Sequence, residues 1–341
     1  LRGRGAGLVG DGVHWARPAS WRRVADAPAE VLHIQHWMAP LATYLLPLAR
    51  MARRRGKRVV VTVHNVEPHE TLPGAGWLDR ALLAAADVLV VHDERGRAVL
   101  AERLGGKADI RVIPHGIRVA REPVHATAAD LERLGLAAGR RHVCLFGNLR
   151  GYKGVPTLLE AWSRLLDKHP DVDLVIAGRL WTGGRGLAGQ TVARWLGSRG
   201  EAAQIRRWLA APGMAGRVHL REGFQPDEHI DALLRLSSFA VFPYLRFASQ
   251  SGAASRAAGL GCPVLVSDVG GLPGLAIDSS WIVPAGDADA LAQAIDAKLA
   301  APDALAAART AQLACIRYCD WAAVAAAHAR LYAELASSPK G

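Results

Sequence analysis

The sequence has few of the features that cross-link a chain or anchor it in a membrane. Its 341 residues include only four cysteines, and aromatic residues make up 6% of it. No apolar run reaches the roughly 18–20 residues that a membrane-spanning helix needs. No basic and apolar leader opens the sequence either. These absences argue against a disulfide scaffold and a membrane-embedded protein, and we expect a cytoplasmic location.

The four cysteines do not suggest a metal site. Cys144 and Cys262 lie in apolar, strand-like runs, where a thiol packs as a small hydrophobe. Cys315 and Cys319 are four residues apart, which places them on one face of a helix. Further ligands are missing from their neighbourhood. We therefore expect reduced cysteines and no bound metal.

Acidic residues are outnumbered by basic ones, 31 to 42, and the formal net charge is +11. A basic surface attracts nucleic acid, anionic lipid or anionic small molecules. No recognition helix, zinc pattern or aromatic-basic strand motif accompanies the charge, so we expect no nucleic-acid partner. The densest basic segment, Arg50–Arg58, has two interpretations: a solvated face, or a patch that meets an anionic membrane surface.

The length suits two domains, and half of the residues are apolar. Short apolar runs alternate with helical stretches, a pattern typical of parallel strands that are buried on both faces and joined by helices. The fold class is therefore α/β. The expected strands are Val31–Ile34, Val59–Val63, Val88–Val91, Ile110–Ile113, Val143–Phe146, Asp173–Ala177, Val218–Leu220, Phe239–Phe242, Val264–Val266 and Trp281–Val283.

A polar stretch without a strand signal, Arg118–Gly139, separates the two series of strands, and we place the interdomain linker there. The expected divisions are residues 1–120, 121–320 and a C-terminal helix over 321–341. No clear strand precedes Val31, so the first strand of the first half is expected to be missing or degenerate. The expected helices include Leu78–Ala86, Val155–Lys168, Asp227–Arg235, Ala288–Ala300 and Pro302–Leu335, the last with a joint at Tyr318–Trp321.

The first glycine cluster, Gly5–Gly10, matches G-x-G-x-x-G but has no strand before it. A dinucleotide fingerprint needs that strand, so a flexible arm is the favoured interpretation.

Polar residues follow the first two expected strands, where open α/β sheets bind ligands. His64, Glu67 and His69 come after Val59–Val63 and can accept a proton or stabilise charge at a reacting centre. A divalent metal or simple loop capping are the alternatives, and His64 is the strongest single candidate. His36 and Trp37 follow the preceding strand, and Trp37 offers either a face for a sugar ring or a core contact.

A basic glycine loop, Phe146–Gly154, connects a strand to the helix that begins near Val155. Its glycines permit close backbone approach, and two cations three residues apart can hold two phosphates. The N-terminus of the helix adds its dipole. The candidate phosphate ligands are Gly147, Asn148, Arg150 and Lys153, although an ordinary basic loop has the same composition.

Other strand ends in this half carry small residues. Ser251 and Gly252 open a helix of small residues, whose N–H groups can bind an anion. Gly178 ends one strand, and Gly270 and Gly271 follow another. Together these segments describe a pocket of phosphate size.

In this order, the motifs resemble those of the GT4-like group of GT-B glycosyltransferases. Phe146–Gly154 with the following Leu-Leu-Glu-Ala is similar to the family's G-x-[IL]-R-x-Y-K-G segment, and Pro263–Gly271 is similar to its P-V-[IV]-x-[ST]-D-x-G-G signature. Val175–Gly178 and Ile113–Ile117 resemble two further segments, and His64 stands where the family has its T-x-H histidine.

The resemblance implies two Rossmann-like domains with parallel sheets facing a central cleft. It implies that the C-terminal half binds a nucleotide diphosphate sugar, that the N-terminal half binds the acceptor and that the last helix crosses back. Arg150 and Lys153 would hold the diphosphate, Ser251 and Gly252 would donate backbone N–H groups, and His64 would face the reacting sugar. No metal or cofactor is implied, and GDP-mannose is the favoured donor over UDP-linked sugars. The acceptor is expected to be a saccharide or a lipid-linked saccharide.

The sequence departs from the family pattern at several positions. The family's two glutamates fall at Ala248 and Arg256, a later glutamate falls at Gly274, and its arginine after the phosphate-loop glycine is Asn148. A subset with a Ser-Gly phosphate turn lacks the glutamate pair in the same way. A catalytically inactive, nucleotide-binding relative is therefore the alternative interpretation.

Overall fold

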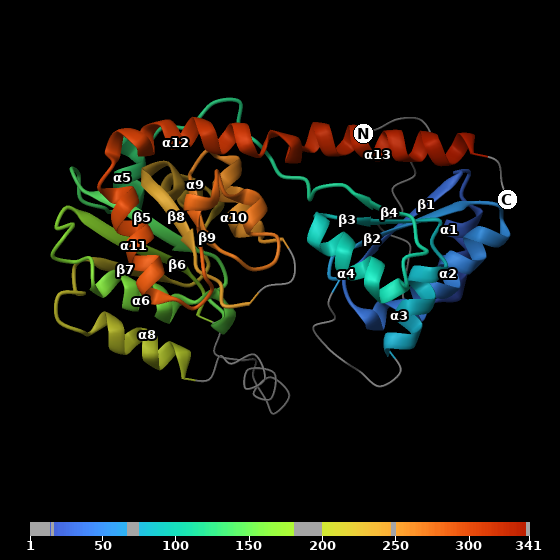
Figure 1. The fold of residues 1–341 in the computed structure, drawn as a ribbon, viewed down its shortest axis with the longest axis horizontal. Coiled ribbons are helices and arrows are strands. Elements are labelled where there is room, and N and C mark those ends of the chain that lie inside the picture. Colours follow the sequence, from blue (N-terminus) through green and yellow to red (C-terminus); the bar gives the residue numbers. More distant parts are fainter. Residues whose placement is uncertain (1–13, 15–16, 67–74, 181–199, 247–249, 339–341) are drawn as a thin grey trace. The chain divides into compact units, whose positions relative to one another are not determined.

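The computed structural model describes residues 14, 17–66, 75–180, 200–246 and 250–338. They form two compact α/β units (Figure 1). One unit comprises the chain up to His115 together with the segment from Ala322 onward, and the other comprises Gly116–Trp321.

The first unit is built on a parallel sheet whose described strands have the order β1-β2-β3-β4. Each new strand along the chain is added beside the previous one, so the sheet grows at one edge, and a helix joins each strand to the next. The elements are α1 (Pro18–Asp26), β1 (Val31–His36), the 3-10 turn η1 (Ala39–Leu41), α2 (Ala42–Arg54), β2 (Arg58–Val63), α3 (Ala75–Ala84), β3 (Val88–Val91), α4 (Glu94–Leu104) and β4 (Ile110–Val112).

The second unit is built on a parallel sheet whose described strands have the order β10-β9-β8-β5-β6-β7. The carboxyl ends of β5, β6, β8 and β9 therefore lie next to one another. The elements are α5 (Ala128–Leu134), β5 (Arg141–Phe146), η2 (Gly151–Lys153), α6 (Val155–Ser163), β6 (Val172–Gly178), α8 (Glu201–Leu209), β7 (Val218–Glu222), α9 (Asp227–Leu236), β8 (Ser237–Phe242), α10 (Gly252–Gly259), β9 (Val264–Ser267), η3 (Pro273–Leu275), η4 (Ser279–Trp281), β10 (Ile282–Val283), α11 (Ala288–Leu299), α12 (Pro302–Cys315) and η5 (Arg317–Cys319).

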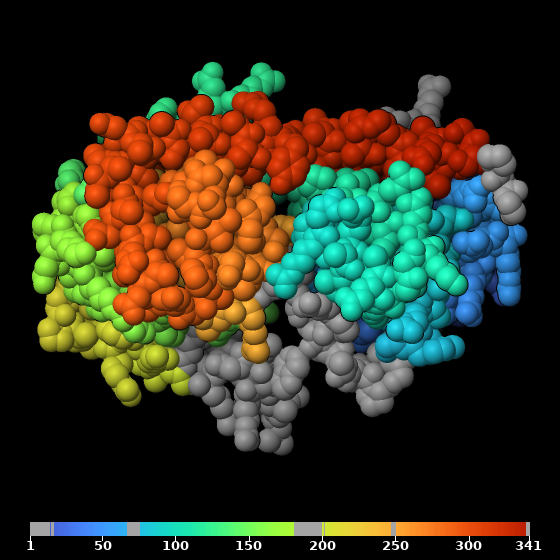
Figure 2. Space-filling view, in the orientation of Figure 1, coloured from blue at the N-terminus to red at the C-terminus, as the bar shows by residue number. Residues whose placement is uncertain are grey.

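The last helix, α13 (Trp321–Ser337), packs on the sheet of the first unit. Val324 and Leu331 lie against Val60 and Val90, so α13 covers the face of that sheet opposite α2 and α3. Figure 2 shows its outer side, in red, over the first unit. Helices thus cover both faces of the sheet, which explains why its central strands, β2 and β3, are almost continuously apolar.

The α/β class with two parallel sheets is confirmed, and the ten expected strands are present within two residues at each end. The joint expected near Tyr318–Trp321 is also present as η5. The linker prediction was wrong in part, because Arg118–Gly139 contains α5 and lies inside the second unit. An Asp130–Arg235 ion pair of 2.5 Å joins α5 to α9.

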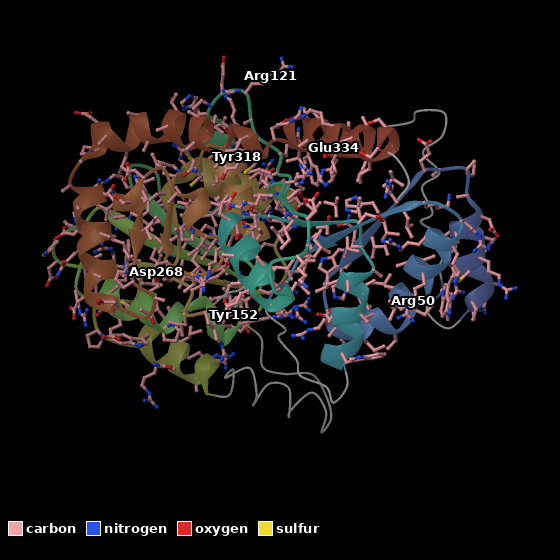
Figure 3. All side chains as sticks on the ribbon, turned by 45° about the vertical axis from the view of Figure 1, so that its right-hand side comes forward. Arg50, Arg121, Tyr152, Asp268, Tyr318 and Glu334 are labelled. Carbon is pink, nitrogen blue, oxygen red and sulfur yellow. The ribbon has the colours of Figure 1, made fainter. Side chains whose placement is uncertain are left out.

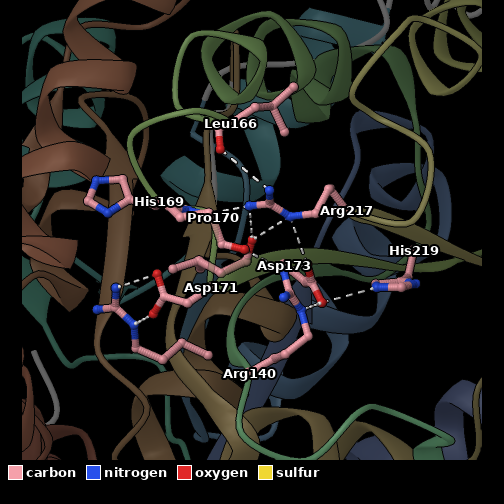
Figure 4. Close-up of polar contacts among 10 residues, drawn as sticks. Arg140, Leu166, His169, Pro170, Asp171, Asp173, Arg217 and His219 are labelled. Atoms are coloured by element: carbon pink, nitrogen blue, oxygen red, sulfur yellow. Dashed lines mark hydrogen bonds and ion pairs between the residues drawn. The ribbon is translucent and has the colours of Figure 1, made fainter.

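An ion-pair cluster lies at the amino ends of β5, β6 and β7 in the second sheet (Figure 4). The buried carboxylate of Asp173 on β6 accepts hydrogen bonds from Arg140 (2.6 Å) and Arg217 (3.1 Å). His219 lies 3.5 Å away on β7. Burial opposes ionisation of Asp173, but hydrogen bonds and charges from Arg140 and His219 outweigh it and hold the pKa of this carboxyl below its usual value.

The membrane-spanning potential of the helices and the state of the cysteines were both addressed from composition. Among the described residues, no helix combines the length and the apolar character that crossing a membrane requires. Cys144 and Cys262 are buried free thiols, as expected, and Cys315 and Cys319 are also free. The described histidine, cysteine and acidic residues contain no group of three that suits a metal ion.

Candidate functional site

The carboxyl ends of β5 and β6 touch through two glycines. The N–H of Gly147 donates to the carbonyl oxygen of Ala177 at 2.9 Å. Gly178 has a φ of +147°, and a Cβ atom there would lie 1.8 Å from the carbonyl oxygen of Gly147. Only glycine fits such a contact. The predicted phosphate-loop glycine and the predicted strand-end glycine therefore lie together.

The turn η2 brings the basic loop against the end of β8. Gly154 adopts a φ of +68°, and a Cβ atom at this position would lie 1.9 Å from the carbonyl oxygen of Pro243. Nearby, the N–H of Leu245 donates to the carbonyl oxygen of Tyr152 at 2.8 Å. These contacts fix the loop that carries Lys153 beside the segment that leads to α10.

Lys153, Tyr244 and Ser251 form a buried chain of hydrogen bonds. Lys153 is 6% exposed, and its ammonium donates to the Tyr244 hydroxyl oxygen. Burial raises the pKa of the Tyr244 hydroxyl, which therefore stays protonated and forms a hydrogen bond of 2.9 Å with Ser251 Oγ. Ser251 Oγ also accepts from the N–H of Ala254 at 3.3 Å and so caps α10.

Among the described residues, the buried ammonium has no acidic partner. None of the carboxylates that the structure describes forms an ion pair with Lys153, and the charge that acts on it is that of Arg150. Burial, with a smaller contribution from Arg150, lowers the pKa of Lys153 to about 8. A buried cation beside a second cation favours a bound anion.

The N-terminus of α10 adds to this anion-binding character. In the part of the chain that the structure describes, the N–H groups of Gly252 and Ala253 have no hydrogen-bond partner. The Cβ atom of Ala253 lies 3.5 Å from where a Cβ of residue 147 would stand. Gly271, after β9, packs against the side chain of Gln250, the residue before Ser251.

The predicted donor-site residues fall into two groups. Gly147, Gly178, Lys153, Ser251 and Gly271 are brought together by contacts around the ends of β5, β6, β8 and β9. Asn148, Arg150 and Gly252 are exposed around them, and Gly270 precedes Gly271 with a φ of +56°. The roles of all these residues in nucleotide-sugar binding stay predictions.

His64 lies at the end of β2 in the first unit. Its ring stacks on Trp37, with centroids 4.7 Å apart and an interplanar angle of 8°. Its Nε2 lies 2.7 Å from Gln35 Oε1, and its Nδ1 lies 3.1 Å from His92 Nε2. Burial and the neighbouring histidines lower the pKa of His64 to about 4, so the ring is neutral at pH 7.

The other predicted acceptor-side residues differ in their exposure. Trp37 is 50% exposed and available to a ligand. His36 is buried and its Nε2 bonds to Asp79, so its side chain belongs to the interior of the unit rather than to a solvent-facing site. Glu67 and His69 lie outside the described residues, as do the Gly5–Gly10 cluster and Ala248.

Most of the basic segment Arg50–Arg58 is engaged within the first unit. Arg55 pairs with Asp26, and Arg53 and Arg58 pair with Asp87. The Lys57 ammonium donates to two backbone carbonyls. Arg50 and Arg54 are exposed on α2, and Figure 3 labels Arg50 there.

Sequence reasoning missed Gln35 and His92 near His64, and the bridging hydroxyl of Tyr244. One signal was present: a histidine stands at or just after the carboxyl end of every strand of the first sheet. These histidines are His36, His64, His92 and His115. Ring contacts connect the last three, with centroids 4.9–6.4 Å apart.

Comparison with known proteins identifies the family. The family model described as "Glycosyl transferases group 1" matches residues 140–301, and "Glycosyltransferase Family 4" matches residues 9–121. Glycogen synthase of Mycobacterium tuberculosis is 28% identical over 328 residues, 92% of this chain and 69% of that relative.

Two solved structures share the fold over most of their length. Sucrose-phosphate synthase from Thermosynechococcus elongatus superimposes with a TM-score of 0.71 and 20% identity, covering 94% of this chain and 77% of that one. HepE from Anabaena, solved with UDP, gives a TM-score of 0.69 and 16% identity, covering 93% and 81%. These structures show the GT-B fold. The two family models, which match one after the other along residues 9–121 and 140–301, show that the chain belongs to the GT4-type, group 1 glycosyltransferases.

Proposed function

We propose that the protein transfers a glycosyl group from a nucleotide diphosphate sugar, bound by the second unit, to a hydroxyl acceptor. The observation that carries this proposal is the buried Lys153 ammonium, which is held by the neutral Tyr244 and has no described carboxylate partner. A diphosphate would supply the missing negative charge.

The same arrangement would stabilise the departing nucleotide. As the bond to the sugar breaks, negative charge grows on the diphosphate, and preorganised cations and N–H dipoles stabilise that charge. Lys153, the exposed Arg150 and the N-terminus of α10 are of the right kind for this task. The proposed reaction therefore needs no metal ion, and it should persist in excess EDTA.

The proposed donor is GDP-mannose, with UDP-linked sugars as the competing class. The structure of HepE with UDP supports a nucleoside diphosphate as the ligand of this fold. The base is decided by a thermal-shift screen of GDP, UDP, ADP and dTDP, because a ligand that binds only the folded chain raises the melting temperature.

The decisive variant is Lys153→Ala, with Lys168→Ala as its control. Lys168 is an exposed lysine of the same unit that pairs with Asp296 at 2.7 Å. We expect Lys153→Ala to abolish the thermal shift and Lys168→Ala to retain it. Unchanged nucleotide binding in Lys153→Ala would refute the proposal.

A non-catalytic, nucleotide-binding protein is the second candidate function. Arg256, which occupies the position of a family glutamate, turns toward α9 and pairs with Asp227 and Asp231 at 2.6 Å each. It therefore does not replace a glutamate chemically. Tight nucleotide binding without hydrolysis or transfer across a panel of donor sugars would favour this second function.

The proposed acceptor is a saccharide or a lipid-linked saccharide at the inner membrane face. Besides Arg50 and Arg54 on α2, the neighbouring α1 exposes Arg22 and Arg23. Clustered arginines bind anionic lipid with about 1 kcal/mol each. Co-sedimentation with vesicles containing phosphatidylglycerol, but not with phosphatidylcholine vesicles alone, would support this location. Charge reversal of Arg50 and Arg54 should weaken binding to the phosphatidylglycerol vesicles.

A further inference from the structure

A continuous chain of hydrogen bonds joins α13 to the carboxyl ends of the strands in the first unit. Its members are side chains from β1, β2 and α13 and from the residues just after β2 and β3, and it ends on a backbone carbonyl after β4. In order, the contacts are Tyr332 Oη to His33 Nδ1 (2.6 Å), His33 Nε2 to Thr62 Oγ1 (2.7 Å), Gln35 Nε2 to His33 Nε2 (3.3 Å), Gln35 Oε1 to His64 Nε2 (2.7 Å), His64 Nδ1 to His92 Nε2 (3.1 Å) and His92 Nδ1 to the Ile113 carbonyl oxygen (3.0 Å).

The carbonyl of Ile113 sets the direction of this chain. A carbonyl oxygen only accepts, so Nδ1 of His92 must carry a proton and donate it. In a neutral ring, Nε2 of His92 is then bare and accepts from Nδ1–H of His64. It follows that a neutral His64 has a bare Nε2, and the partner of that atom has to be a donor.

Gln35 can be that donor if its carboxamide is turned by half a rotation, which leaves its shape unchanged. Its NH₂ group then faces His64 Nε2, and its oxygen faces His33 Nε2. His33 donates from Nε2 to this oxygen and to Thr62, and its Nδ1 accepts from the Tyr332 hydroxyl. Every contact of the chain is satisfied with neutral rings.

A proton on His64 or His92 would offer another solution, but the surroundings oppose it. Burial and the nearby rings of His92, His115 and His36 lower the pKa of His64 to about 4. Burial also lowers the pKa of His92, although its hydrogen bond to the Ile113 carbonyl and, to a smaller extent, Asp93 partly offset this. Both rings are therefore neutral at pH 7.

We propose that Gln35 and His92 are positioning residues that hold His64 as the neutral Nδ1–H tautomer. The proposal builds on the transferase function. Since both ring nitrogens of His64 are engaged within the unit and Trp37 covers one ring face, His64 contributes a fixed neutral surface and does not remove the proton of the acceptor. The chain also connects this tautomer to α13 through His33 and Tyr332.

The tautomer is measurable by ¹⁵N NMR on the full chain labelled in histidine, with resonances assigned by single His→Gln variants. At pH 7 we expect His64 to be protonated on Nδ1 and bare on Nε2. A wild-type His64 that carries its proton on Nε2, or that is an imidazolium, overturns the proposal.

Two variants test the positioning residues themselves. In Gln35→Glu, the carboxylate can only accept, so Nε2 of His64 gains a proton, and the pKa of His64 should rise by about one unit or more. Gln204→Glu on the exposed surface of α8 is the control and should leave this pKa unchanged. An unchanged His64 pKa in Gln35→Glu contradicts the role of Gln35.

His92→Phe removes the group that accepts the hydrogen bond from His64 Nδ1–H. This variant should shift His64 toward the Nε2–H tautomer, and an unshifted tautomer contradicts the role of His92.

Kinetics connect the inference to transfer. In Gln35→Glu, we expect the acid limb of the kcat profile to move to higher pH by as much as the pKa of His64 rises, so that kcat is lowered at pH 5 and recovers at pH 8, with little change in the KM for the donor. If the pH profile of kcat in this variant equals that of the wild type, the protonation state of His64 does not affect transfer. Failure of every nucleoside diphosphate to bind would refute the proposed function while the NMR result stands on its own.

Discussion

The ammonium nitrogen of Lys153 lies 4.3 Å from the centre of the Tyr244 ring and donates to the hydroxyl oxygen of the same residue. Tyr244 thus holds a buried cation by a ring face and a hydroxyl, both of them neutral. A carboxylate in this place would neutralise the cation and repel a diphosphate. The neutral partner keeps the positive charge of Lys153 available to an incoming anion.

Removal of the Tyr244 hydroxyl should weaken nucleotide binding. Tyr244→Phe keeps the ring under Lys153 but removes the hydrogen bonds that orient the ammonium and Ser251. Hydrogen bonds to charged groups contribute about 1.5–3 kcal/mol, so we expect affinity for the preferred nucleoside diphosphate to fall at least about tenfold by calorimetry. Tyr318→Phe, which removes a hydroxyl that donates to the Gly274 carbonyl at 3.2 Å, should retain wild-type affinity. Equal affinities in all three proteins would contradict the role of Tyr244.

The buried ammonium should lower stability in a pH-dependent way. Burial, aided by Arg150, places the pKa of Lys153 at about 8 in the folded chain, against about 10.4 in an unfolded one. Between these values the unfolded chain binds more protons, so the contribution of Lys153 to the free energy of unfolding rises with pH. Lys153→Met should therefore be more stable than the wild type at pH 7, by about 2–3 kcal/mol.

Denaturant unfolding of both proteins at several pH values measures this difference. It should shrink as the pH rises from about 8 toward 10, because the lysine then loses its charge in the folded chain. A difference that stays constant over this range would show that the ammonium is not destabilised by burial.

Asp173 should contribute to stability with the opposite pH dependence. Its pKa in the folded chain lies below the unfolded value of about 4, so its contribution is complete above that pH and is lost as the pH falls through the folded pKa. Asp173→Asn breaks a buried charge cluster with Arg140 and Arg217, and such changes cost about 3–5 kcal/mol. In urea unfolding, the gap to the wild type should be widest near pH 7 and should narrow below pH 4. A gap that does not depend on pH would contradict an ionised Asp173.

The strands were predictable from sequence because most contain a short apolar run, and the central ones, β2, β3, β5 and β6, are buried on both faces. Side-chain direction was harder to predict. His36 ends β1 much as His64 follows β2, but the side chain of His36 shares the buried face of β1 with Ile34, while Gln35 between them points outward. A strand-end histidine was therefore expected at the surface and lies inside the unit.

Tertiary pairing explains the other differences. The basic cluster Arg50–Arg58 looks continuous in sequence, but Asp26 and Asp87, from distant positions, neutralise part of it. The bridge from Lys153 to Ser251 depends on Tyr244, which β8 places beside the loop after β5. Local patterns indicate which residues are charged or small, and only the order of strands in the sheet decides which of them meet.

Two glycines of the candidate site should respond to alanine in opposite ways. Gly178→Ala would force a Cβ atom to within 1.8 Å of the Gly147 carbonyl oxygen at a φ of +147°, so we expect a loss of stability of about 2–4 kcal/mol. Gly252 has open space around its Cα and begins α10, and alanine there should raise stability by about 0.5–1 kcal/mol.

The two variants separate folding from binding. Although Gly252→Ala should be the more stable protein, its methyl group would stand where the anion approaches the N–H groups of α10, so affinity for the nucleoside diphosphate should fall about tenfold. Denaturant unfolding and calorimetry on the same samples measure both effects. A stable Gly252→Ala protein with unchanged affinity would show that the diphosphate does not contact the start of α10, and the anion would then have to bind through Lys153 and Arg150 alone.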